Sequence, residues 1–134
     1  MGATIIHKSG YRKTSVARAT VKKGKGLVLV NNQPYKEYQP NVDLQLKLLE
    51  PLLISGMEAK VDVTLNVFGG GQNSQVDAMR QAIAKALVEL SGSEELKRKF
   101  VEYDRSLLVA DTRFKEMKKP NNSHARAKRQ KSYR

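Results

Sequence analysis

Residues 59–92, AKVDVTLNVFGGGQNSQVDAMRQAIAKALVELSG, hold a strand pattern, a glycine turn and a helix pattern in direct succession. Apolar and polar residues alternate from Val61 to Val67, which predicts a strand with one buried face. The apolar stripe that follows has helical spacing; its members are Val76, Met79, Ile83, Ala86, Leu87 and Leu90. Ser74 and Asp77 match a capping box, so we expect a helix at about residues 74–91 with Gly92 near its end.

Two further strands are expected before this segment. Residues 14–23, TSVARATVKK, alternate in a way that could hold one cationic face toward phosphate. Residues 27–30 form a second β-rich run after a glycine-marked turn, and the sequence NNQP stops it. A hairpin of these two strands is the simplest interpretation.

Helices are expected on both sides of the central segment. Leu44, Leu48 and Leu52 have helical spacing, and Pro51 is expected to bend or end that helix. Ser93 is a good cap for a last helix that carries Leu96, Phe100 and Tyr103 toward the body. The apolar pattern stops after Asp111. The class is therefore α+β, with one body at residues 1–111 and an extended basic tail at 112–134.

The charge of the chain points to a polyanionic partner. Lys and Arg total 25 against 13 acids, a net charge of +12. Seven cations lie between Lys8 and Lys25 with no acid before Glu37, and residues 113–134 hold nine cations and one acid. Without a run of membrane-spanning length or a signal-peptide pattern, we expect a cytoplasmic protein with no membrane partner.

The residue types exclude several kinds of site. Without cysteine there is no disulfide, zinc finger or thiol nucleophile, and with only His7 and His124 a histidine-rich metal site is excluded. No acid-base pair stands at a readable spacing. We therefore expect no catalytic residue, no metal, no cofactor and no small-molecule substrate. A lone histidine is usually polar surface, or here a stacking partner for a base.

The glycine turn at Gly69, Gly70 and Gly71 leaves three interpretations open. The sequence GGGQNS falls one residue short of the dinucleotide fingerprint, since Ser74 stands where the third glycine belongs. A P-loop would need Lys followed by Ser or Thr after the glycines. The alternatives are a tight turn into a helix, or a helix N-terminus that binds an RNA phosphate.

The last eleven residues, HARAKRQKSYR, combine five cations with Tyr133 and no acid. Such a run could be a localisation-like or solubility segment, because basic runs are weak signals alone. Guanidinium groups also bind phosphate bidentately and stack on exposed bases, as Tyr133 can. This combination favours RNA as the partner of the tail.

Together, several motifs resemble the universal ninth protein of the small ribosomal subunit, in its archaeal and eukaryotic version. They are GYRKTSVARATV, GKG with VNN, FGGGQNSQVDAMRQAIAKALVEL, LLVADTRFKEMKKP and the terminal RQKSYR, and they occur nearly end to end in family order. The sequence departs from the family at three places. Thr112 stands where the family usually has proline, and Ser74 stands where it often has glycine. Residues 121–124, NNSH, replace glycine-rich residues.

The resemblance implies a fold like the second domain of the fifth small-subunit protein. That fold has a mixed sheet with a left-handed β-α-β crossover, helices on one side and here a basic C-terminal tail. It also implies a non-enzymatic role in the head of the small subunit, beside neighbouring ribosomal proteins. Its tail would contact the anticodon stem-loop of the transfer RNA in the peptidyl site.

The implied contacts are assigned to matching positions of this sequence. Those to ribosomal RNA are Arg12, Lys13, Arg18, Lys22, Gly69, Gly70, Gly71, Arg80, Lys118, Lys119, Arg126, Lys128 and Arg129. Those to transfer RNA are Lys131, Ser132, Tyr133 and Arg134. A structural protein outside the ribosome and a small phosphate-binding enzyme remain the rival hypotheses, and salt-stable co-sedimentation with small subunits separates all three.

Overall fold

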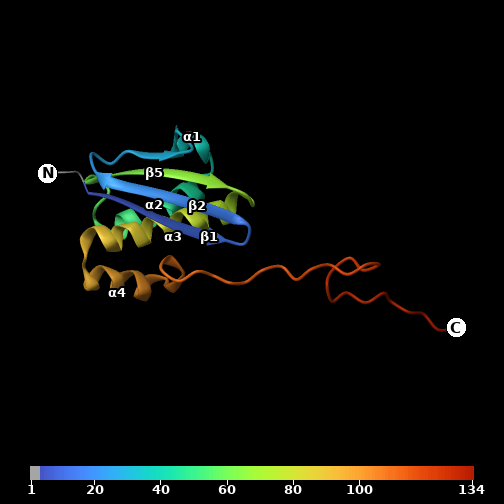
Figure 1. The fold of residues 1–134 in the computed structure, drawn as a ribbon. Coiled ribbons are helices and arrows are strands. Elements are labelled where there is room, and N and C mark those ends of the chain that lie inside the picture. Colours follow the sequence, from blue (N-terminus) through green and yellow to red (C-terminus); the bar gives the residue numbers. More distant parts are fainter. Residues whose placement is uncertain (1–3) are drawn as a thin grey trace.

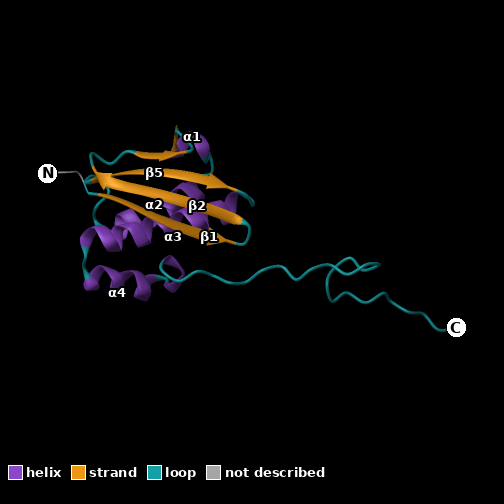
Figure 2. Ribbon diagram, in the orientation of Figure 1, coloured by secondary structure: helices purple, strands orange, loops and turns teal. Residues whose placement is uncertain are grey.

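The computed structural model describes residues 4–134, in which a mixed five-stranded sheet carries helices on one side (Figures 1 and 2). The strands are β1 (Ile5–Arg12), β2 (Ser15–Lys23), β3 (Val28–Val30), β4 (Gln33–Pro34) and β5 (Val61–Phe68). The helices are α1 (Tyr35–Tyr38), α2 (Val42–Ser55), α3 (Gln72–Ser91) and α4 (Glu94–Tyr103), followed by a 3-10 turn, η1 (Arg105–Leu107). The expected α+β class is confirmed.

The sheet has the order β1-β2-β5-β3-β4, in which only the β3–β5 pair is parallel. The expected hairpin of residues 14–23 with 27–30 is therefore wrong, because β5 lies between these strands. Asp62 on β5 shapes the connection that follows β2. Its Oδ1 accepts hydrogen bonds from the N–H groups of Lys25, Gly26 and Leu27 at 2.8, 3.1 and 3.0 Å. These bonds direct the chain around β5 instead of back along β2.

The core lies between the sheet and α3, which packs on β1, β2 and β5, while α2 and α4 pack against α3. The expected alternation of β5 is confirmed, since Val61, Val63, Leu65 and Val67 are all buried. The expected stripe of α3 also faces the core; of its six members only Leu90 is partly exposed.

Strand β1 is the longest of the elements that the sequence patterns did not predict; the others are β4, α1 and η1. Its inward positions are Ile6, Lys8, Gly10 and Arg12, of which only Ile6 is a large apolar residue. Gly10 is required there because an added Cβ would overlap the backbone carbonyl oxygen of Ala78 on α3. Because α3 packs closely on β1, a glycine stands where an apolar side chain would otherwise continue the strand pattern.

Three local expectations need correction. Ser74 is not the cap of α3: the helix begins at Gln72 with Gly71 as N-cap, and Gly71 N–H donates to Ser74 Oγ at 3.1 Å. Pro51 does not end α2, which continues to Ser55 with Pro51 buried. Tyr103 is 57% exposed, although its hydroxyl donates to Glu50 on α2 at 3.2 Å. Ser93 caps α4 and Gly92 ends α3, as expected.

After η1 the chain leaves the body as an extended segment (Figure 1). A parallel bridge pairs Asp111 with Arg12 at the end of β1, and from residue 112 onward no helix or strand is formed. Within residues 4–134, none of the helices has the length and apolar character needed to cross a membrane.

Candidate nucleic-acid interface

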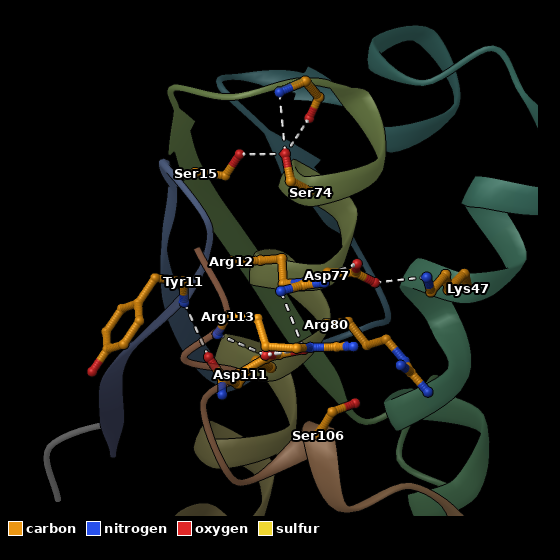
Figure 3. Close-up of polar contacts among 12 residues, drawn as sticks. Tyr11, Arg12, Ser15, Lys47, Ser74, Asp77, Arg80, Ser106, Asp111 and Arg113 are labelled. Carbon is orange, nitrogen blue, oxygen red and sulfur yellow. Dashed lines mark hydrogen bonds and ion pairs between the residues drawn. The ribbon is translucent and has the colours of Figure 1, made fainter. Parts of the chain in front are cut away.

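The β1–β2 turn and the glycine turn lie side by side at one end of the sheet (Figure 3). Ser15 joins them: its Oγ donates to the Gly69 carbonyl at 3.0 Å and lies 2.8 Å from Ser74 Oγ. Lys13 occupies the tip of the β1–β2 turn with a φ of 54° and an exposed side chain. Two segments that are far apart in sequence thus form one surface.

The glycine turn needs glycine at two positions. Gly69 and Gly70 have φ values of 77° and 62°, in the left-handed region. An added Cβ on Gly70 would overlap Ser15 Oγ, and one on Gly69 would lie 2.5 Å from the Thr14 carbonyl oxygen. Gly71 instead has extended backbone and open space around it. The turn is therefore shaped by packing against the β1–β2 turn.

A shallow hollow opens at this end of α3, lined by Lys13, Thr14 and residues 70–74. The N-terminus of a helix carries partial positive charge, and Lys13 adds a full one. No acid occurs between residues 63 and 76 or before Glu37. We call Lys13, Thr14 and residues 69–74 the turn surface; its charge suits an anion.

Arg18 and Lys22 lie on the sheet face opposite the helices, with exposed side chains. The Arg18 guanidinium lies 5.6 Å from the centre of the Phe68 ring, in a cation–π contact. Lys22 pairs in register with Asp62 on β5. The expectation of a cationic strand face is met at both positions.

Arg80 lies inside the protein. It is 7% exposed on α3, where it forms ion pairs with Glu50 of α2 and, at 3.0 Å, with Asp104. Burial opposes ionisation of Asp104, but hydrogen bonds from Ser106 and Arg80 keep its pKa below the ordinary value. The guanidinium is thus held between two carboxylates, and the RNA contact that the resemblance implies for Arg80 stays a prediction.

Arg12 is also turned inward. Its Nη1 lies 3.1 Å from Asp111 Oδ2 and its Nε 3.9 Å from Asp77, which in turn pairs with Lys47 at 2.6 Å (Figure 3). Its side chain is only 19% exposed. These contacts link β1, α2, α3 and the start of the tail, while the ribosomal RNA contact expected of Arg12 stays a prediction.

Asp111 fixes the root of the tail. Arg113 donates to both of its carboxylate oxygens, at 3.0 Å from Nε and 2.7 Å from Nη2. The side-chain and backbone hydrogen bonds from Arg113, with the charge of Arg12, hold the pKa of Asp111 far below its usual range. The carboxylate is thus ionised at neutral pH and bridges body and tail.

The tail presents its other cations to solvent. The side chains expected to contact RNA are all exposed; they are Lys118, Lys119, Arg126, Lys128, Arg129, Lys131, Ser132, Tyr133 and Arg134. Tyr133 is 87% exposed. Only Arg126 is paired among them within the described residues, with Glu116 at 2.8 Å. An extended chain with free cations is the geometry expected of a segment that follows a polyanion.

The comparisons with known proteins agree with this arrangement. Residues 10–134 match the family model described as ribosomal protein S9/S16. The chain belongs to the ribosomal protein S9/S16 family. Its relatives include the small ribosomal subunit protein uS9 from Methanococcus maripaludis strains C7 and C5. Each is 47% identical over 133 residues, which cover 97% of this chain and 98% of the relative. The family suggested by the sequence motifs is confirmed.

The sequence patterns missed two residues of this interface. Phe68, at the outward end of the β5 alternation, was assigned no role, although an aromatic residue at a solvent-facing strand position was a readable signal. Asp111 was taken only as the end of the apolar pattern. Its pairing with Arg12 joins residues 99 positions apart, which no local pattern can predict.

Proposed function

We propose that this protein is a structural constituent of the small ribosomal subunit in the cytoplasm, where it binds ribosomal RNA in the subunit head beside neighbouring ribosomal proteins. The observation that carries the proposal is the family match over residues 10–134. It includes both the turn surface and the whole basic tail. A structural role also agrees with the positions of Asp62, Glu50 and Asp77, which are held in a turn and in ion pairs within the body.

The body contacts ribosomal RNA through the turn surface and the cations beside it. Lys13 and the N-terminus of α3 offer positive charge to a phosphate, and the small residues Gly69, Gly70 and Gly71 allow close approach of the RNA backbone. Arg18 and Lys22 extend this surface across the open sheet face. Phosphate contacts of this kind fix orientation without reading sequence.

The tail contacts ribosomal RNA along its length and transfer RNA at its tip. Lys118, Lys119, Arg126, Lys128 and Arg129 neutralise ribosomal RNA phosphates. Lys131, Ser132, Tyr133 and Arg134 contact the anticodon stem-loop of the transfer RNA in the peptidyl site. From Pro120 to Arg134 an extended chain spans at most about 50 Å, enough to reach a ligand well away from the body.

The ribosomal RNA proposal is tested by the salt dependence of binding. Each single-strand phosphate contact adds about −0.7 to the slope of log affinity against log salt concentration. Truncation after Asp111 removes nine cations and one acid, so filter binding to small-subunit ribosomal RNA should show a much flatter slope. Deletion of residues 1–4, which contain no cation side chain, is the matched control. Equal slopes for the truncated and intact proteins would show that the tail does not bind phosphate.

The transfer RNA proposal is tested by deletion of Lys131–Arg134 alone. Subunits should still assemble, while peptidyl-site transfer RNA binds more weakly by at most about 1–3 kcal/mol, because many other subunit groups hold the same ligand. The loss should not depend on the anticodon. The double variant Lys118→Ala, Lys119→Ala is the control for lost tail charge. Unchanged transfer RNA dissociation together with failed assembly would reassign the tip to ribosomal RNA.

A further inference from the structure

The sheet face opposite the helices is open, and it carries exposed aromatic side chains. Figure 2 shows α2, α3 and α4 gathered on the other side. Phe68 at the end of β5 is 52% exposed and Tyr11 on β1 is 49% exposed. The strand register aligns Tyr11 with Val16 and Val16 with Phe68, so these positions form one row across β1, β2 and β5. The Tyr11 ring lies at the edge of the sheet, 5.5 Å from Lys85 Nζ of α3, and Phe68 is the ring within the open face. Phe68 thus presents an aromatic ring to solvent on this face.

A polar row lies beside this aromatic row. Arg18 is opposite Ser9 on β1 and Asn66 on β5, and its guanidinium lies over the Phe68 ring at 5.6 Å. In the next row His7 Nδ1 lies 3.0 Å from Thr20 Oγ1. A shallow hollow lies over the Arg18 row and the His7–Thr20 row. It is lined by His7, Lys8, Ser9, Arg18, Ala19, Thr20 and Asn66. It offers hydrogen-bonding groups next to an aromatic surface.

The charge at this end of the sheet is positive. Arg18 lies on the face and Lys13 at the adjoining turn, and the neighbouring stretches 4–36 and 63–76 contain no acid. Asp62 is on the same face but at the opposite end of β5. Three backbone N–H groups bind its Oδ1 and keep its pKa below the ordinary value. An anionic ligand therefore meets attraction at the Phe68 end.

We propose that this open sheet face binds an unpaired nucleotide of RNA, with the base stacked on the face of the Phe68 ring that Arg18 does not cover and the phosphate held by Arg18 and Lys13. The proposal rests on the proposed function and names the form of RNA that this face takes. Bases in a duplex are already stacked on both sides, whereas a splayed base can stack on an exposed ring. Arg18 is positioned over the ring before binding, which lowers the entropy cost of ordering it.

The absence of tryptophan from the sequence allows a direct test. Phe68→Trp places one indole at the proposed stacking position. Val101→Trp places one on the outer face of α4, where Val101 is similarly exposed at 45%. Each variant is titrated with a fluorescein-labelled oligouridylate of about 12 nucleotides and with a blunt RNA duplex of the same length, while anisotropy reports occupancy.

The proposal predicts that the oligouridylate strongly quenches the tryptophan at position 68 and leaves that at position 101 nearly unchanged. The duplex, at equal occupancy, should quench position 68 much less. In addition Phe68→Leu, which keeps an apolar side chain, should weaken oligouridylate binding about tenfold, since one base–aromatic stack is worth roughly five- to 150-fold in affinity. Circular dichroism confirms that the variant is folded.

The possible failures are distinguishable. RNA that binds by anisotropy without quenching at position 68 overturns the inference and leaves the proposed function intact. Equal quenching by oligouridylate and duplex also overturns it, because the face then does not select unpaired bases. Absence of any RNA binding contradicts the proposed function itself. Quenching that requires another subunit protein instead of RNA would identify the face as a protein contact and overturn the inference.

Discussion

Arg80 shows that the neighbours of a cation decide its role, even in a chain with a net charge of +12. The sequence motif placed Arg80 among the RNA contacts, because a family pattern carries no information on which way a side chain turns. In the structure it is 7% exposed and joins Glu50 of α2 to Asp104 after α4. It therefore holds three helices together.

We predict that Arg80→Met lowers the free energy of unfolding by about 2–3 kcal/mol. This is less than the ~3–5 kcal/mol expected for one partner of a fully buried pair, because Glu50 and Asp104 keep some access to water. Urea unfolding at neutral pH measures the change. The control Arg98→Met, on the exposed face of α4, should stay within about 0.5 kcal/mol of wild type. If Arg80→Met weakened RNA binding without lowering the free energy of unfolding, the result would contradict the internal role and support the predicted RNA contact.

At the scale of the elements, the strand and helix at residues 61–91 could be predicted because each has a strong apolar period. Strand β1 could not, because at its inward positions a glycine and two cations stand where apolar residues would mark a strand. The false hairpin has a related cause. The β2–β3 connection depends on Asp62, which lies 35 residues after Leu27. Turn-forming residues indicate only the conformation of their own segment, so they could not reveal this contact.

We predict that Gly10→Ala destabilises the protein by about 1–3 kcal/mol, because the new methyl group meets the backbone of α3 at Ala78, which has little freedom to move. In hydrogen-exchange measurements, Gly10→Ala should speed the exchange of the β1 amides more than that of the β5 amides, each compared with wild type. Ser9→Ala, the exposed neighbour on the same strand, is the matched control and should be within about 0.5 kcal/mol of wild type. If Gly10→Ala were as stable as Ser9→Ala, β1 would not pack on α3 at this distance.

The Asp62 connection predicts a pH dependence. The backbone N–H groups of Leu27 and Lys25 lower the pKa of Asp62 in the folded state, so its stabilisation is present above the unfolded pKa of about 3.9. It is lost as the pH falls further through the folded pKa. Asp62→Asn should therefore lose less stability than wild type between pH 7 and about pH 3. Urea midpoints across this range measure the difference.

Glu102→Gln, on the exposed surface of α4, controls for the loss of one negative charge. An Asp62→Asn variant that tracked wild type at every pH would mean that the neutral side chain holds the connection equally well. The ionised carboxylate would then contribute nothing to the stability of the β2–β3 connection.

At the scale of the whole molecule, the charge is divided unequally between body and tail. Residues 113–134 carry eight of the twelve net positive charges, and the structure shows this segment leaving the body in extended form (Figure 1). The end of the apolar pattern near Asp111 was readable from the sequence. Its anchoring by Arg12 and Arg113 was not, because it depends on tertiary contacts.

We propose that body and tail together hold this protein in the small ribosomal subunit. The decisive measurement adds purified protein to small subunits that lack it, washes them with high salt and sediments the particles. Because many phosphate contacts on two separate surfaces must break together, we predict retention of one copy per particle after the wash. If the protein remained in the supernatant at both low and high salt, it would not be held in the small subunit by body and tail.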